Sequence, residues 1–337
     1  MTSLARRGLR RGGLLAVLVF VLLVVAAVAQ AGPKQELANS AHSTPVESAA
    51  TRAACATCHD GPTFAGERPE GVTITDPKGL SCTDCHDWSG SQAPEGLRVY
   101  GEAKLPNGLV LQNGSAALCV TCHNGRRDTG DPKTAQGLSA PHRSPQGEML
   151  AGTGAFEFPG YRYTNSVHTT LEEGCVACHM APGPAEGEAP FERIGGHTFT
   201  MAYEGTENLN ACTDCHPLAT SFNRPATADW DGDRRLEGVQ DEVHGLVELV
   251  KGAIEAALDG GRGGVIHESH GAVEFLKKDG QTKLEGVPES IYKATYNLLF
   301  VENDGSLGIH NTAYAVQLLQ SSYQAVTGHP VPDAAIR

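Results

Sequence analysis

The clearest helical pattern of apolar residues lies in the C-terminal third of the chain. Between positions 239 and 258, apolar residues recur at spacings of four, three and one, which places them on one face of an α-helix. Gly260 and Gly261 follow and predict its end. Two further helices are expected at 289–301 and at about 311–326. The short link between these two predicts an antiparallel helix pair.

The region before this part has no comparable apolar pattern. The chain contains 40 Gly and 19 Pro, and only 6% of its residues are aromatic, which suits an ordinary hydrophobic core poorly. One small hairpin is expected at 101–111, around the turn dipeptide Asn107-Gly108. Elsewhere we expect short helices and Gly/Pro loops.

The N-terminal segment has the pattern of a secretory signal. Four Arg precede an unbroken apolar run at 14–29, and Ala29-Gln30-Ala31 fits a cleavage site before Gly32. The alternative is an uncleaved membrane anchor, for which the run is slightly short because a span needs about 20 apolar residues. The predicted organisation is therefore a signal at 1–31, a loop-rich region at 32–221 and a helical C-terminal region at 222–337.

All ten cysteines belong to five C-x-x-C-H motifs. The motif residues are Cys55, Cys58 and His59; Cys82, Cys85 and His86; Cys119, Cys122 and His123; Cys175, Cys178 and His179; and Cys212, Cys215 and His216. Two thiols at this spacing can bond the two vinyl groups of one porphyrin, while the next residue, His, reaches the iron from the same side. Neither zinc sites nor disulfides require His directly after every second Cys. The motifs predict five c-type haems.

Five haems would change the expected fold. The first cysteines of successive motifs are only 27, 37, 56 and 37 residues apart, so the porphyrins would pack closely together. The predicted fold class is mainly α with much irregular loop. It is a multihaem cytochrome c fold, built around a chain of haems, with a C-terminal helical module that supplies one or more iron ligands.

The histidine count favours two imidazoles per iron. The chain has 14 His, of which nine lie outside the motifs, whereas Met is scarce. Bis-His ligation is therefore expected, and it lowers the reduction potential relative to His/Met ligation. The expected distal ligands are His42, His142, His168, His197 and His310. Either of His267 and His270 is an alternative, whereas His244 should face solvent and His329 should be free. The sequence does not predict which distal His serves which motif.

Five stretches carry a resemblance to exported bacterial multihaem cytochromes c. They are 115–127, 141–150, 163–180, 195–199 and 300–311. The wider relatives of that group include the pentahaem ammonia-forming nitrite reductases and the octahaem enzymes of the nitrogen cycle. The resemblance implies distal-ligand roles for His142, His168, His197 and His310.

Three functions fit these observations. The first is a pure electron carrier, and the second is a reductase of nitrite, hydroxylamine or a sulfur oxyanion with one open haem. No C-x-x-C-K motif, the usual mark of the catalytic haem in the resembling nitrite reductases, occurs here. An open site would need cationic and proton-donating groups, for which the candidates are Arg126, Arg127, Arg162, Tyr161 and Tyr163; these Arg would otherwise pair with haem propionates. The third function is a subunit of an extracellular cytochrome filament.

Charge and the N-terminal signal limit the partners. The formal net charge is −13, and removal of the four Arg of segment 1–31 would make it −17. Such a surface disfavours nucleic acid and anionic lipid. It favours basic patches on redox partners, such as a quinol dehydrogenase or other cytochromes, and self-association is a further alternative. We expect an exported protein, periplasmic or extracellular, with membrane attachment only if the signal is retained.

Overall fold

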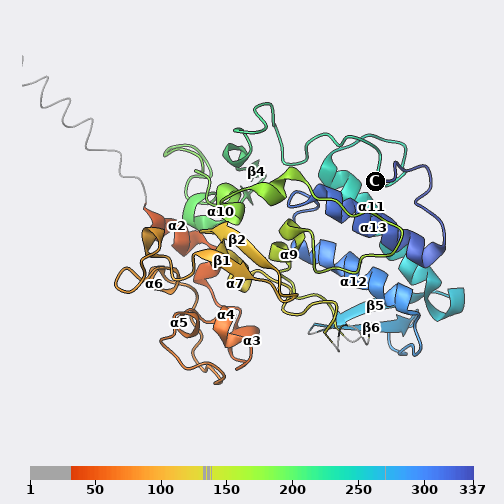
Figure 1. Cartoon of the computed structure of the whole chain (residues 1–337), viewed down its shortest axis with the longest axis horizontal. Helices are drawn as coiled ribbons and strands as arrows, with labels where there is room; N and C mark the ends of the chain where they lie inside the picture. Colours follow the sequence, from red (N-terminus) through yellow and green to blue (C-terminus); the bar gives the residue numbers. More distant parts are fainter. Residues whose placement is uncertain (1–31, 132–133, 135–136, 138, 270) are drawn as a thin grey trace, which may run out of the picture.

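The computed structural model describes residues 32–131, 134, 137, 139–269 and 271–337. The predicted signal at 1–31 and the alternative ligand His270 lie outside these residues. Figure 1 shows a bundle of three long helices on one side of the molecule and a loop-rich part with short helices on the other. The three sheets of the described chain are each a pair of antiparallel strands.

The three helices predicted in the C-terminal part are confirmed. They are α11 (Val239–Gly261), α12 (Glu289–Asp304) and α13 (Thr312–Thr327). Regular helical geometry in α11 already stops at Leu258, and Asp259 and Gly260 follow with φ of 52° and 63°. These left-handed conformations turn the chain into the next strand, so the helix ends where the two glycines predicted its end.

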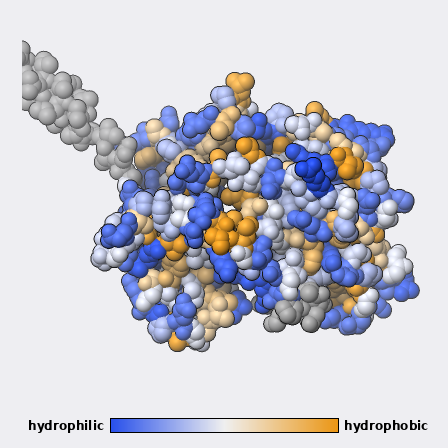
Figure 2. All heavy atoms as spheres, viewed as in Figure 1, coloured by the Kyte–Doolittle hydropathy of each residue, from blue (hydrophilic) through white to orange (hydrophobic). Residues whose placement is uncertain are grey.

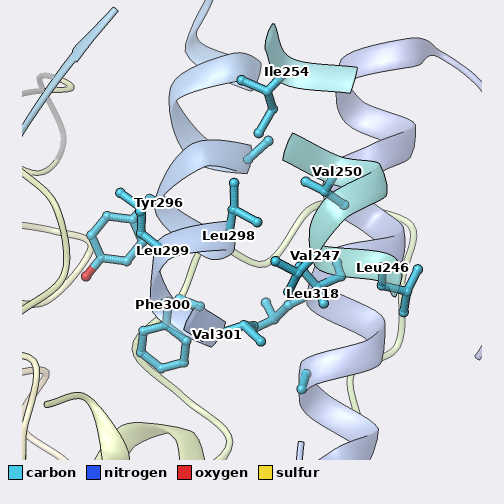
Figure 3. Packing of buried hydrophobic residues seen from close by; sticks show 14 of the residues in the cluster. Leu246, Val247, Val250, Ile254, Tyr296, Leu298, Leu299, Phe300, Val301 and Leu318 are labelled. Carbon is cyan, nitrogen blue, oxygen red and sulfur yellow. The ribbon is translucent and has the colours of Figure 1, made fainter. Parts of the chain in front are cut away.

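The apolar stripe of α11 packs against the other two helices. Leu246, Val250 and Ile254 are fully buried and face Leu298 of α12 and Leu318 of α13 (Figure 3). Burying each such side chain contributes about 1.5–3 kcal/mol. In this part of the molecule, side chains packed on other side chains form the core, so its packing does not involve a porphyrin.

Buried amide side chains tie the segment between the third and fourth motifs to this bundle. Asn297 accepts the backbone N–H of Phe156 and donates to its carbonyl, both at 2.8 Å. Gln317 accepts the N–H of Thr164 at 2.8 Å and donates to the carbonyl of Arg162 at 2.9 Å. The helical bundle therefore fixes the loop that leads into the fourth motif.

The loop-rich part contains mostly single helical turns. Its α-helices are α2 (Pro33–Asn39), α3 (Glu47–Ala50), α4 (Ala56–His59), α5 (Gly61–Phe64), α6 (Cys82–Cys85), α7 (Ala117–Cys122), α9 (Gln146–Ala151) and α10 (Gly174–His179). Its 3₁₀ helices are η1 (Ala41–Ser43), η2 (Pro94–Gly96), η3 (Val167–Thr170), η4 (Gly196–Thr198) and η5 (Leu209–Ala211). Four motifs lie in short α-helices, as expected. The fifth instead follows η5 in a turn.

The predicted hairpin at 101–111 is confirmed in slightly longer form. Strand β1 (Gly101–Lys104) pairs with β2 (Val110–Gly114), and Gly108 has φ of 88° in the turn between them. Two more hairpins are β3 (Ala202–Tyr203) with β4 (Thr206–Glu207), and β5 (Gly264–Ser269) with β6 (Ala272–Lys277). His267 lies in β5 of the last hairpin.

The surface is mixed in character. Figure 2 shows polar residues over most of the visible face, with small separate apolar patches. Within the described part of the chain, no helix has both the length and the apolar character that a membrane span requires.

Candidate haem-binding sites

The structure brings each motif His next to a different distal candidate. The ring centres lie 6.2 Å apart for His59 and His142 (site 1), 6.5 Å for His86 and His197 (site 2), 6.0 Å for His123 and His42 (site 3), 6.1 Å for His179 and His310 (site 4), and 6.2 Å for His216 and His168 (site 5). Each site is named here together with the two Cys of its motif. All five expected distal His are used once, and none is shared.

These separations fit one iron between each pair of rings. An imidazole nitrogen binds a transition metal at about 2 Å, and the ring centre lies about 1.2 Å farther. Two imidazoles on opposite sides of one iron would therefore have ring centres about 6.4 Å apart. The five observed separations, 6.0–6.5 Å, lie around this value. The ten cysteines, all in the described chain, are free thiols and so remain available for thioether bonds.

Hydrogen bonds orient most of these rings through Nδ1. Nδ1 donates to a backbone carbonyl in three cases: His86 to Glu95 at 2.6 Å, His168 to Ile309 at 2.6 Å and His179 to Phe199 at 2.9 Å. A proton on Nδ1 leaves the lone pair on Nε2, the nitrogen free to bind a metal. The chain thus presets the tautomer that an axial ligand needs.

Side chains form the hydrogen bond to Nδ1 in four other rings. Nδ1 of His142 pairs with the Ser144 hydroxyl at 2.7 Å, and that of His42 with the Ser40 hydroxyl at 3.3 Å. The two remaining partners are the Gln146 amide oxygen of α9, for His123 at 3.2 Å, and the Asp304 carboxylate of α12, for His310 at 2.7 Å.

Burial lowers the pKa of six of the paired imidazoles, which favours their neutral form; they are His42, His59, His123, His142, His179 and His216. Burial, aided by neighbouring His123 and His179, lowers the pKa of His42 to about 4, and burial beside Arg126 lowers that of His142 to about 4. Neutral imidazole is the metal-binding form. At His310 burial also disfavours the charge, but the Asp304 carboxylate outweighs it and raises the pKa.

The sites lie close to one another in an order that differs from the sequence. The Cys58 and Cys122 thiols are neighbours that shift each other's pKa, which joins sites 1 and 3. The Cys119 and Cys175 thiols are neighbours in the same sense, which joins sites 3 and 4. Burial raises the pKa of Cys178, and the nearby Cys212 thiol raises it further. Sites 4 and 5 are therefore neighbours.

Phe199 sits where sites 2, 3 and 4 meet. Its ring centre is 5.0 Å from that of His42 and 6.0 Å from that of His197, while its carbonyl accepts from His179. Phe199 has φ of 57°, a left-handed conformation that a non-Gly residue adopts only when its surroundings impose it. The sequence gives no signal for this junction.

The remaining described histidines lie outside these pairs. His244, His267 and His329 are exposed. Nδ1 of His267 is 3.7 Å from a Glu274 carboxylate oxygen in the β5–β6 hairpin. None of the three has a ring contact with a motif His within the described residues.

The groups considered for an open catalytic site fall into two places. The two Tyr are held on α13, whereas Arg126 lies beside a motif thiol. Tyr161 donates to Gln324, and Tyr163 donates to Ser321 at 2.8 Å, so both are fastened to α13. Arg126 lies 3.0 Å from the Cys58 sulfur, and with Arg127 it lines an open cavity of about 500 Å³.

Comparisons with known proteins bear on the fold. A family model described as "Cytochrome c7 and related cytochrome c" matches residues 38–124, which include the first three motifs. The outer cell wall cytochrome OcwA superposes with a TM-score of 0.55 at 20% identity, over 87% of this chain and 50% of that protein. The fold is that of a multihaem cytochrome c. The chain spans half the length of OcwA.

A second cytochrome resembles the chain more weakly. The undecahaem cytochrome from the S-layer of Carboxydothermus ferrireducens has a TM-score of 0.45 at 18% identity, over 90% of this chain and 42% of that one. No curated protein sequence matches the chain.

Proposed function

We propose that this chain binds five covalent c-type haems, each between two histidines, and transfers electrons outside the cytoplasmic membrane. The observation that carries the proposal is the set of five His pairs with ring centres 6.0–6.5 Å apart, one for each motif. When bound, each haem would supply one-electron chemistry by alternating between ferric and ferrous iron.

The protein residues hold and shield the cofactor. The two Cys of each motif would form the thioether bonds, and the motif His and its partner His would bind the iron. Because Nδ1 of seven of these His is already hydrogen-bonded, the rings need little reorientation when iron changes its charge. Small reorganisation suits electron transfer.

Closure of both axial positions supports a carrier over a reductase. A substrate needs a free coordination position, and each of the five motif His has a second imidazole at bonding distance for an intervening iron. Tyr161 and Tyr163 are engaged with α13. The cavity lined by Lys104, Arg126 and Arg127 suits the carboxylates of haem propionates.

Sites 2 and 5 are the proposed points of exchange with partners. Cys82 and Cys215 are the two exposed motif cysteines. Three strongly exposed apolar side chains accompany these sites. Trp88, 64% exposed, stacks on His86 of site 2. At site 5, Val167 (72% exposed) directly precedes His168, and Leu218 (92% exposed) follows His216 by two residues. Apolar contact around an exposed cofactor edge favours other redox proteins as partners.

Two observations support an exported location. One is the predicted signal, and the other is the similar fold of OcwA, which is named as an outer cell wall cytochrome. Covalent haem attachment also fits a compartment outside the cytoplasm. We therefore place the chain at the cell surface or in the periplasm, where it would pass electrons between redox proteins.

The carrier proposal is tested on the holoprotein. We expect five haems per chain by pyridine haemochrome and mass, and only low-spin ferric signals by EPR. His142→Ala should convert one haem in five to high spin and open it to cyanide, whereas His244→Ala, at an exposed unpaired histidine, should leave all five low-spin. A stoichiometric high-spin haem in the wild-type protein that turns over nitrite would establish a reductase instead.

A further inference from the structure

Site 4 has an axial histidine bonded to a carboxylate. The Oδ1 atom of Asp304 accepts the Nδ1 proton of His310 at 2.7 Å, and the Asp304 side chain is only 1% exposed. Asp304 is the last residue of α12, and His310 lies at the entrance to α13. Two helices of the bundle therefore set this contact.

The carboxylate is fixed by its own loop. The hydroxyl and backbone N–H of Ser306 both donate to Oδ2 of Asp304, and the same hydroxyl accepts the N–H of His310 at 3.1 Å. Gly305 allows this tight return because it has φ of 74°. Within the described residues His310 is the one basic side chain paired with Asp304.

The other sites have no equivalent. Where a hydrogen bond to Nδ1 of a paired His is present elsewhere, its partner is a carbonyl, an amide oxygen or a hydroxyl. The nearest analogue is Glu36, whose Oε2 lies 3.6 Å from Nδ1 of His197, beyond a normal hydrogen bond. Site 4 is thus electrostatically unlike its four neighbours.

A carboxylate on Nδ1 changes the ligand that the iron receives. It draws the Nδ1 proton toward itself, gives the ring partial imidazolate character and makes Nε2 a stronger donor, which stabilises ferric over ferrous iron. A buried negative charge adds to this, because the surroundings screen it weakly. We propose that Asp304, acting through His310, gives site 4 the lowest reduction potential of the five sites. This inference rests on the proposed function.

The test is a potentiometric titration of the holoprotein, with dithionite as the electron source and EPR as the readout. Asp304→Asn keeps an acceptor for His310 but removes the charge. At a potential where the wild-type site 4 is half reduced, the ratio of ferrous to ferric iron should rise by about tenfold, which is the lower end of the effect that loss of such a partner has on metal affinity. Loss of one low-spin signal in His310→Ala identifies site 4.

Two variants and one wild-type measurement complete the design. Asp304→Glu, which retains the charge, should return the titration toward that of the wild type, and Glu36→Gln should move site 2 much less. If Asp304→Asn does not fold, the wild-type spectrum still decides, because the last haem to be reduced should be the one lost in His310→Ala. Five unchanged transitions in a folded Asp304→Asn variant would overturn the inference. Failure of the wild type to show five low-spin haems would instead overturn the proposed function.

Discussion

At the scale of single residues, the glycines before His197 decide how that ring is presented. A Cβ on Gly195 would lie 2.3 Å from the carbonyl oxygen of Ala181 and 2.6 Å from the backbone nitrogen of Gly183. Gly195 also has φ of 73°. The Gly-Gly-His sequence thus reflects close backbone packing that positions His197 opposite His86.

Replacement of Gly195 tests this packing together with its backbone conformation, since φ of 73° with ψ of −178° is adopted almost only by Gly. Gly205→Ala is the control for a positive φ without close packing, since Gly205 has φ of 81° but nothing within 4 Å of its would-be Cβ. The control should lose about 1–2 kcal/mol from left-handed strain alone. Gly195→Ala should lose clearly more in thermal unfolding of the holoprotein, together with the low-spin signal of site 2. Equal losses in the two variants would show that close packing at Gly195 does not matter.

The sequence could indicate residue types but not their partners. C-x-x-C-H identifies the attachment residues because the chemistry fixes their spacing. A distal imidazole has no such constraint, and the distal set stays a prediction even though the structure brings each candidate to its own motif His. Asp304 could not be found from sequence, since its role depends on the turn that returns the chain to His310.

At the scale of elements, periodicity predicted what packs against protein. The stripe of α11 and the turn of the β1–β2 hairpin were readable because they bury side chains against other side chains or follow turn chemistry. The motif segments should bury their inner faces against porphyrin, so they carry no apolar period. The turn at Cys212 and the two-residue strands β3 and β4 show how little regular structure such segments need.

The link between α4 and α5 depends on one buried carboxylate. Asp60 accepts the N–H of Thr63 at 3.1 Å, the hydroxyl of Thr63 at 2.6 Å and the N–H of Lys78 at 2.9 Å, and it pairs with Arg68 at 3.0 Å. Burial alone would raise the pKa of Asp60, but these hydrogen bonds and the Arg68 charge together hold it below the usual 3.8. The folded state therefore stabilises the ionised form of Asp60.

Asp60→Asn should accordingly destabilise the protein in a pH-dependent way. Because the folded pKa lies below the unfolded value of 3.8, the stabilisation is complete above that pH and is lost as the pH falls through the lower folded pKa. We expect a loss of about 1–3 kcal/mol at neutral pH, which shrinks below about pH 4, in urea unfolding of the holoprotein. Asp76→Asn, at a carboxylate 72% exposed, should cost less than about 1 kcal/mol. A loss that grows in acid would contradict this account.

At the scale of the whole molecule, the sites connect segments that are far apart in sequence. Site 3 joins the loop after α2 to α7, and site 4 joins α10 to the entrance of α13. Site 1 lies against site 3, as the proximity of the Cys58 and Cys122 thiols shows. This order depends on how the complete chain encloses the sites, which explains why motif spacing could predict close packing but no path.

The net charge makes a prediction for the whole molecule. A formal charge of −13 attracts cationic redox partners, and salt weakens that attraction because the screening length falls from about 30 Å at 0.01 M to about 10 Å at 0.1 M. In stopped-flow oxidation of the reduced holoprotein, the rate with hexaammineruthenium(III) should fall as salt is added, and the rate with ferricyanide should rise. The cationic and the anionic probe serve as each other's control, since a salt-induced change in the protein itself would move both rates in the same direction. The same salt dependence for both probes would mean that the exposed sites 2 and 5 do not experience the acidic field of the molecule, and basic partners would then have no electrostatic advantage there.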